Sequence, residues 1–204
     1  MEWLRSKKVF VRKRKSDETR ALGALLYFAG LSTRKTARIL SAIEEVSDES
    51  VRLWYHRFRK AMPEPKKIDR KAIAMDETKI KIGKRQWFVW SAIDLRSGEI
   101  LAIHLSEGRS YLDTLCFLRK LTKRCKNRPI VYVDRGPWYP WALERFGFPW
   151  IHNTFGERSP IEGWFNVLKS RTKRFWNRFP DNARMETVES WLESFALFYN
   201  FWIS

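Results

Sequence analysis

The hydrophobic periodicity of the chain changes at a proline-containing segment, AMPEPKKIDRK, at residues 61–71. Before this segment, apolar residues recur every three or four positions, as they do in amphipathic helices. After it, short runs rich in β-branched and aromatic residues alternate with turn residues and with further helical patterns. We therefore expect a small helical domain and an α/β domain, joined by a linker at residues 61–70.

Residues 16–60 carry three short helical patterns, and a basic arm with seven lysines or arginines precedes them at residues 1–15. Serines that can cap helices precede all three patterns, and a glycine ends the first. In the first pattern, three residues recur on one face and are expected to point inward: Leu22, Leu25 and Leu26. In the third pattern, the residues at i, i+3, i+4 and i+7 are expected to be buried: Val51, Trp54, Tyr55 and Phe58.

The opposite face of the third pattern is cationic, because Arg52, His56 and Arg59 must then face outward. Three short helices with a basic outer face on the last one are typical of a helix-turn-helix DNA-binding domain. A merely solvated surface is the alternative, since arginines are common on the wet side of small bundles. The formal net charge of +17 and the isoelectric point near 10.2 favour a polyanionic partner, with nucleic acid first.

The rest of the composition restricts the class of protein. No apolar run approaches the ~18 residues of a membrane helix, and the N-terminal residues lack an apolar signal-peptide core. We therefore expect a cytoplasmic protein that binds the DNA of the nucleoid and has no membrane partner. Cys116 and Cys125 lie nine residues apart in a predicted helix without a CxxC pair, so two buried thiols are a better interpretation than a zinc site.

Residues 71–204 show strand and helix patterns in the order βββαβαβα, with one additional helix at the end. KAIAMDETKIKI, QWFVWSAID and ILAIHLS are predicted to form three antiparallel strands joined by turns. IVYVD and FPWIHN follow as the fourth and fifth strands, each reached through a helix. A meander followed by βαβ crossovers predicts an α/β domain with a mixed five-stranded sheet flanked by helices.

Three carboxylates stand out in this basic domain. Asp76 lies in the middle of a strand, Asp134 ends the fourth strand before a Gly-Pro turn, and Glu162 lies one turn inside a helix. If their strands pair, Asp76 and Asp134 are neighbours that repel each other unless divalent cations lie between them. Oxygen ligands without His or Cys suit Mg²⁺ or Mn²⁺. The residues alone leave a simpler interpretation open, in which Asp134 starts a turn and Glu162 stabilises a helix N-terminus.

Three blocks of sequence, MDETKIKIGKRQWFVWSAID, VYVDRGPWYPWAL and TFGERSPIEGWFNVLKSRTKRF, resemble the catalytic core of insertion-sequence transposases of the DDE superfamily. The resemblance runs from about residue 15 to the C-terminus and implies a ribonuclease-H-like fold preceded by a helix-turn-helix. It implies that Asp76, Asp134 and Glu162 are the catalytic triad and bind two Mg²⁺ or Mn²⁺ ions. Glu157 is the alternative third carboxylate, and Glu77 is expected to be a surface or supporting group on the opposite face of its strand.

The same resemblance implies a DNA transposase that cleaves DNA at element ends and transfers the strand into target DNA by two-metal phosphoryl transfer. Its partners would be double-stranded DNA and further copies of the chain, as a homodimer or a higher assembly. A basic and aromatic run at residues 169–179 is expected to continue the last-carboxylate helix and to contact phosphates through Lys169, Arg171, Lys173 and Arg174. The alternatives are a structure-specific nuclease or resolvase of the same fold, and a decayed copy that only binds DNA.

Overall fold

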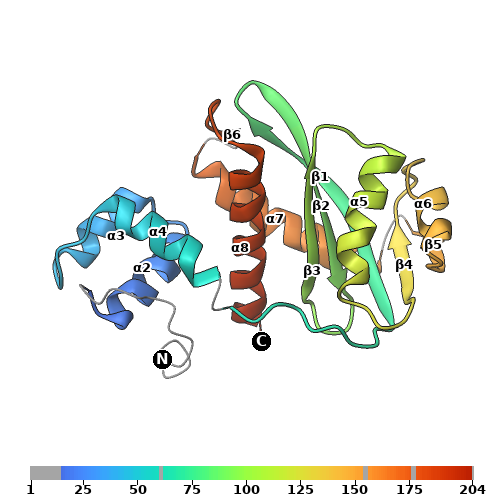
Figure 1. The fold of residues 1–204 in the computed structure, drawn as a ribbon, viewed down its shortest axis with the longest axis horizontal. Coiled ribbons are helices and arrows are strands. Elements are labelled where there is room, and N and C mark those ends of the chain that lie inside the picture. The colour runs from blue at the N-terminus through green and yellow to red at the C-terminus, as the bar shows by residue number, and fades with distance from the viewer. Residues whose placement is uncertain (1–14, 60–61, 154–155, 176–177, 204) are drawn as a thin grey trace. The chain divides into compact units, whose positions relative to one another are not determined.

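The computed structural model describes residues 15–59, 62–153, 156–175 and 178–203, drawn as a ribbon in Figure 1. The chain divides into two compact units, Met1–Pro63 and Glu64–Ser204. The basic arm predicted at residues 1–15 lies, except for its last residue, outside the described residues. In the part of the chain that the structure describes, no helix is long and apolar enough to cross a membrane.

The described residues of the first unit form the helices α2 (Asp17–Phe28), α3 (Thr33–Leu40) and α4 (Asp48–Arg59). A serine side chain accepts a hydrogen bond from a backbone N–H in the first turn of each helix, as the sequence predicts for a capping residue. The three caps are Ser16, Ser32 and Ser47, with donors at 3.0, 3.2 and 3.2 Å. The inward face predicted for α4 is confirmed, because all four residues are buried: Val51, Trp54, Tyr55 and Phe58.

Helix α2 packs against α4 through small side chains instead of its leucines. The buried apolar positions of α2 are Ala21, Gly23 and Ala24. A Cβ atom added to Gly23 would lie only 2.9 Å from Trp54 Cε3, so this close approach requires a glycine. An inward orientation is therefore wrong for Leu22, which is 41% exposed, whereas Leu25 and Leu26 are half-buried.

The second unit is built on a six-stranded mixed sheet. Its strands are β1 (Ala72–Ile82), β2 (Arg85–Asp94), β3 (Ile100–Ser106), β4 (Ile130–Val133), β5 (Trp150–His152) and β6 (Arg178–Phe179). The order is β3-β2-β1-β4-β5, and β6 pairs with the far end of β1. β1, β2 and β3 are antiparallel neighbours, whereas β4 and β6 run parallel to β1, and β5 runs parallel to β4. The five predicted strands and their mixed sheet are confirmed.

The sixth strand was not predicted, because the basic run at residues 169–179 was expected to be helical throughout. Helix α7 (Ser159–Lys173) ends earlier, and the chain then returns to the sheet at Arg178 and Phe179. Phe179 is buried, and its ring lies 5.4 Å from that of Trp191. The helix therefore ends before the basic run does, and Trp176 of the same run lies outside the described residues.

Helices cover both faces of the sheet (Figure 1). α5 (Tyr111–Thr122) and α6 (Pro140–Arg145) share a buried cluster with β1 residues Ile73 and Met75. On the other face, Trp164 of α7 donates a hydrogen bond from its indole Nε1 to Ser91 of β2 at 3.0 Å. Ser91 lies opposite Asp76 in the β1–β2 register, so Asp76 shares the face that α7 covers.

The two cysteines differ in exposure. Cys125 is buried, as predicted, but it follows the end of α5 and does not lie inside that helix. Cys116 lies on α5 and is exposed, so the prediction of two buried thiols was wrong for this residue. Both are free thiols.

Helix α8 (Met185–Ile203) is attached to the sheet through Glu189. Its carboxylate accepts hydrogen bonds from Leu105 N at 3.0 Å and Lys120 Nζ at 2.8 Å, and His104 Nδ1 lies 3.3 Å away. Burial opposes ionisation of this carboxyl, but hydrogen bonds from His104 and Lys120 outweigh burial and lower the pKa of Glu189 to about 2. The ionised form therefore ties α8 to β3 and to α5.

The lowered pKa of Glu189 predicts that the folded chain loses stability in acid. The pKa of Glu189 is lower in the folded chain than its ordinary value of 4.5, so its contribution is complete above that value and is lost as pH falls toward about 2. We expect Glu189→Gln to unfold at lower urea concentration than the wild type at pH 7, with a smaller difference at pH 3. Glu186→Gln, at the exposed start of α8, is the matched control. A difference that does not change with pH would contradict this assignment.

Candidate active site

The pairing of β1 with β4 places Asp76 and Asp134 side by side. The recorded pairs are Ala72 with Ile130, Ile73 with Val131, and Ala74 with Tyr132. Each pair is separated by 58 positions, which is also the separation of Asp76 and Asp134. Because paired residues of parallel strands point to the same face, the same register continued by two residues places both carboxylates on the face that α7 covers. β4 ends at Val133, so Asp134 lies at an open end of the sheet.

The chain turns away sharply after Asp134. Gly136 N donates a hydrogen bond to Asp134 Oδ1 at 2.8 Å, and Tyr139 N donates to Gly136 O at 3.2 Å. A Cβ atom at Gly136 would lie 2.7 Å from Trp138 Cε2, so only glycine fits this turn. The turn fixes one oxygen of Asp134 and directs the following residues into α6.

Asp76 is the most constrained carboxylate of the site. Its Oδ1 accepts a hydrogen bond from Glu77 N at 2.9 Å, and its Oδ2 lies 2.5 Å from Nη2 of Arg158. Arg158 directly precedes α7 and is 7% exposed. Burial raises the pKa of Asp76, the charge of Arg158 lowers it and that of Asp134 raises it, and the net result is a pKa above the ordinary value. One arginine therefore does not fully offset burial and the neighbouring negative charge.

Glu77 extends the acidic cluster on the other face of β1. The hydroxyl of Tyr139 donates to its carboxylate in a short hydrogen bond, and Arg109 Nη1 donates at 3.2 Å. The side chain of Glu77 is 3% exposed, so a surface role is excluded although the opposite face was correctly predicted. Burial raises the pKa of Glu77, the hydrogen bond from Tyr139 lowers it, and the charges of Asp76 and Asp134 raise it, so that the net pKa is raised.

Tyr139 and Arg109 fix the carboxylate of Glu77 through the hydrogen bonds that they donate to it. Burial and the charge of Glu77 raise the pKa of Tyr139 far above its ordinary value, so the hydroxyl remains a donor at neutral pH. The guanidinium of Arg109 lies 4.6 Å from the centre of the Trp138 ring and 4.9 Å from that of Phe88. Sequence reasoning missed Tyr139, Arg109 and Arg158, because none of them lies near Glu77 or Asp76 in the sequence and no local pattern links them to these carboxylates.

Glu162 lies in the first turn of α7, is exposed, and is one helical turn from Arg158. Its backbone N donates to Arg158 O at 3.2 Å. Among the residues that the structure describes, no three Asp, Glu, His or Cys side chains are close enough together to hold a metal ion. The structure thus brings Asp76 and Asp134 together, and leaves Glu162 outside this pair. Glu157, the alternative third carboxylate, is also exposed.

The pair fits a hard divalent cation by its chemistry. Both side chains offer only oxygen atoms, which Mg²⁺ and Mn²⁺ prefer. Burial is the main cause of the raised pKa of Asp76, and the negative charge of Asp134 adds to it. A divalent cation held by Asp76 and Asp134 would offset their negative charges.

The predicted DNA-contacting residues of α4 differ in exposure. Arg52 is exposed and forms an ion pair with Glu49 at 2.5 Å. His56 and Arg59 are half-buried, so an outward orientation is confirmed only for Arg52. Burial, together with the charges of Arg52 and Arg59, lowers the pKa of His56, so this imidazole is neutral at pH 7.

The predicted DNA-contacting residues of α7 also fall into two groups. Lys169, Lys173 and Arg174 are exposed. Arg171 is 7% exposed, and its guanidinium lies 5.7 Å from the ring centre of Phe175 and 5.6 Å from that of Trp191. Its position corrects the expectation of a solvent-facing cation, because the side chain packs between α7 and α8.

The chain matches one protein family and is similar to two uncharacterized proteins. The family described as "DDE domain" matches residues 70–197. An uncharacterized protein of Methanocaldococcus jannaschii is 46% identical over 197 residues, which cover 97% of this chain and 92% of that protein. An uncharacterized protein of Aquifex aeolicus is 48% identical over 59 residues, or 29% of this chain and 49% of that protein.

Two solved structures complete the comparison. The catalytic core domain of BIV integrase is 18% identical, with a TM-score of 0.46, and the match covers 62% of this chain and 80% of that chain. A chain of the simian T-cell lymphotropic virus intasome is 16% identical, with a TM-score of 0.49, over 88% of this chain and 67% of that chain. The second unit is a DDE domain of the ribonuclease-H-like fold class. The chain belongs to the DDE transposase family, a family of DNA-cutting proteins.

The contact between Tyr139 and Glu77 can be tested by removing one oxygen atom. Tyr139→Phe leaves the buried carboxylate of Glu77 with Arg109 alone beside two other acids. We expect the free energy of unfolding to fall by about 1.5–3 kcal/mol, the range for a hydrogen bond to a charged group. Urea unfolding followed by tryptophan fluorescence measures it. Tyr132→Phe on β4, whose side chain points to the other face of the sheet, is the control. Equal stabilities of the two variants would refute this role of the hydroxyl.

Proposed function

We propose that this protein is a DNA transposase that cleaves DNA at the ends of its element and joins the freed end to target DNA. The observation that carries the proposal is the adjacency of Asp76 and Asp134 at the open end of β4, in a chain of the DDE family with a net charge of +17. Catalysis by two metal ions requires such carboxylates and needs no covalent nucleophile from the protein.

Asp76 and Asp134 would hold metal ions. We propose two ions, and either Mg²⁺ or Mn²⁺ as their identity. When bound, the ions activate the attacking oxygen and stabilise charge on the phosphate. Glu162 is the proposed third ligand, since it lies in the first turn of the helix whose N-terminal residue, Arg158, already contacts Asp76. Glu77 is proposed as a supporting group that remains bound to Tyr139 and Arg109.

The proposed reaction has two in-line displacements. Water first attacks a phosphodiester at the element end, so that one P–O bond forms and another breaks, which leaves a free 3′-OH. This 3′-OH then attacks a phosphodiester of the target DNA, with the same exchange of bonds. Lys169 would position the strand, because it is exposed and lies seven residues, or about two turns, from Glu162 on the same face of α7. Lys173 and Arg174 would contact phosphates farther along the strand.

The first unit is proposed as the helix-turn-helix that recognises the terminal sequences of the element. Arg52 and Arg59 of α4 would contact DNA as cations, and the neutral His56 as a hydrogen-bonding group. Joining two ends in concert requires at least two active sites, so a homodimer or a higher assembly on double-stranded DNA is part of the proposal. The proposed place of action is the cytoplasm, where the nucleoid DNA lies.

The test uses the full chain, Mg²⁺ and a duplex that carries the sequences flanking the gene. The wild type is expected to nick the duplex at the element ends and to form joined products. We expect Asp134→Asn and Glu162→Gln to lose nicking by at least about 100-fold, because the metal-held carboxylates are worth several kcal/mol of transition-state stabilisation. Glu157→Gln, the matched control from the loop before α7, should retain activity.

Other outcomes would assign another function. Hydrolysis of branched or RNA-containing substrates without joined products would indicate a nuclease or resolvase. Binding without cleavage by the wild type would indicate a decayed copy. Loss of nicking in Glu157→Gln together with activity in Glu162→Gln would reassign the third carboxylate.

A further inference from the structure

The β1–β2 hairpin continues well beyond the candidate active site. Its paired residues extend from Asp76 opposite Ser91 to Ile82 opposite Arg85, and Gly83 and Lys84 form the turn. At the other edge of β1, pairing with β4 ends at Ala74, and among the described residues β6 pairs with the outer end of the strand at Lys81 and Ile82. Figure 1 shows this outer part of the hairpin projecting past the end of α5.

The outer hairpin has one apolar face and one cationic face. Thr78, Ile80 and Ile82 are buried, whereas Lys79 and Lys81 are exposed. The apolar face is anchored to the rest of the unit, because Phe179 pairs with Ile82 and its ring contacts Trp191 of α8. The alternation of the strand thus holds both lysines outward on one face.

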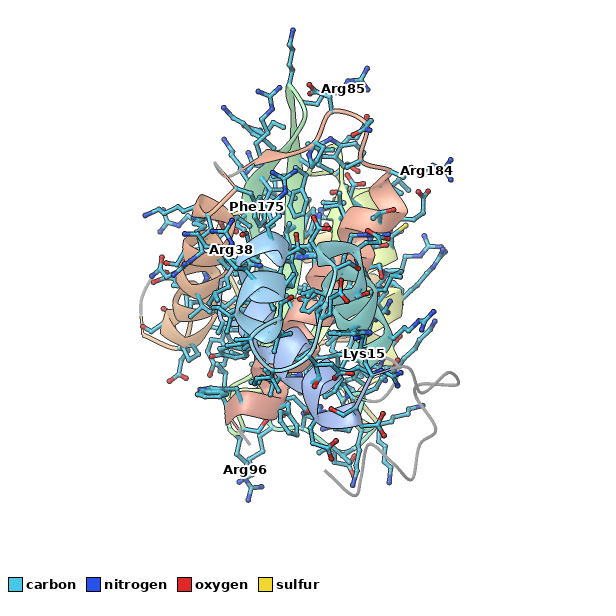
Figure 2. The ribbon with its side chains drawn as sticks, turned by 90° about the vertical axis from the view of Figure 1, so that its left-hand side faces the viewer. Lys15, Arg38, Arg85, Arg96, Phe175 and Arg184 are labelled. Carbon is cyan, nitrogen blue, oxygen red and sulfur yellow. The ribbon has the colours of Figure 1, made fainter. Side chains whose placement is uncertain are left out.

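Strand β6 and the turn add further cations to this face. Arg178 lies directly opposite Lys81 in the parallel register, so its side chain points to the same face. Lys84 and Arg85 are exposed at the turn, and Figure 2 shows Arg85 at the outer end of the hairpin. We name Lys79, Lys81, Lys84 and Arg178 the hairpin cationic face. Arg85 lies opposite Ile82 in the register, so its side chain belongs to the other face and borders this set only at the turn.

Few acidic groups compensate this charge. Arg178 pairs with Asp181 at 3.1 Å, and Arg85 with Glu107 at 3.7 Å. For the three lysines of the face, the described part of the chain records no ion pair. Like charges held this close repel one another, and a polyanion on the face would relieve that repulsion.

The cationic face begins three residues along β1 from Asp76, on the opposite face of the sheet, and leads away from the active site. Lys79 is three residues from Asp76 on the same strand and lies on the same face as Glu77 and its partner Arg109. At about 3.3 Å per residue, Lys79 lies about 10 Å and Lys81 about 17 Å along the strand from Asp76. One strand of DNA advances about 3.4 Å per nucleotide, so these distances correspond to about three to five nucleotides from the reacting phosphate.

We propose that the hairpin cationic face binds the phosphate backbone of duplex DNA a few nucleotides from the cleaved bond, independently of base sequence. The proposal rests on the proposed function for the identity of the duplex. It adds a contact surface on the face of the sheet opposite α7, of which sequence reasoning included only Arg178, as part of the basic run at residues 169–179. Lysines without a planar fork contact phosphates as point charges, which suits backbone binding and not base recognition.

The test compares two double variants with the same change in charge. Lys79→Gln/Lys81→Gln removes two cations of the face. Lys123→Gln/Lys126→Gln removes two exposed cations near Cys125, which bridges to Ile68 at the other end of the sheet. Dissociation constants of both proteins and the wild type are measured for a duplex of arbitrary sequence over a series of salt concentrations. Melting temperatures measured alongside show that both variants are folded.

We expect the salt dependence of log K to become shallower by about 2 for the hairpin variant, because each lost phosphate contact removes about 0.9 from the slope. The control variant should retain the wild-type slope. Equal slopes for all three proteins, or equal losses in both variants, would overturn the proposal. Unchanged DNA binding with aggregation of the hairpin variant would also overturn it, and would assign the lysines to protection of the sheet edge.

The proposal and the proposed function fail in different ways. If the wild type does not nick element ends but the hairpin variant loses salt-dependent binding, the cationic face stands and the transposase proposal falls. If nicking occurs and the slopes are equal, the transposase proposal stands and the cationic face falls.

Discussion

The structure depends on holding mutually repelling carboxylates at the junction of β1 and β4. Asp76 and Asp134 are placed together by the parallel register, and Glu77 follows on the next residue of the same strand. Burial raises the pKa of both Asp76 and Glu77, and Asp134 raises each further. A fold that gained only stability from this region would replace these groups with apolar side chains. The retention of these carboxylates at a cost in stability fits the metal-binding role that we propose for Asp76 and Asp134.

The surrounding residues reduce the electrostatic repulsion among these carboxylates but do not remove it. Arg158 supplies one positive charge to Asp76, and Tyr139 and Arg109 supply donors to Glu77. These three groups come from separate loops, so the cluster also ties the start of α7, the start of α6 and the loop before α5 to β1. The same arrangement leaves the Asp134 side of the pair accessible at the end of β4. Local charge compensation and an accessible carboxylate agree with the metal- and DNA-binding role proposed for this site.

Local patterns predicted the elements, and long-range contacts explain what they missed. Alternating and helical periods predicted the five strands, and the spacing of Asp76 and Asp134 matches the register of their strands. The same patterns could not show that Gly23 lets α2 approach Trp54, which turns Leu22 outward. Nor could they show the return of the chain to the sheet at β6, because two residues carry no period. The partners of the acidic cluster were missed for the same reason: Tyr139, Arg109 and Arg158 meet it only in three dimensions.

The most direct test of the account is the binding of Mg²⁺ to the protein without DNA, measured by isothermal titration calorimetry. The account predicts saturable binding to the wild type and to Glu157→Gln, and its loss in Asp76→Asn and in Asp134→Asn, because both carboxylates are needed to hold the ion. Melting temperatures should rise with Mg²⁺ only for the proteins that bind it. Equal binding by wild type and Asp134→Asn would contradict the account, since the adjacency of the two carboxylates would then have no part in holding metal.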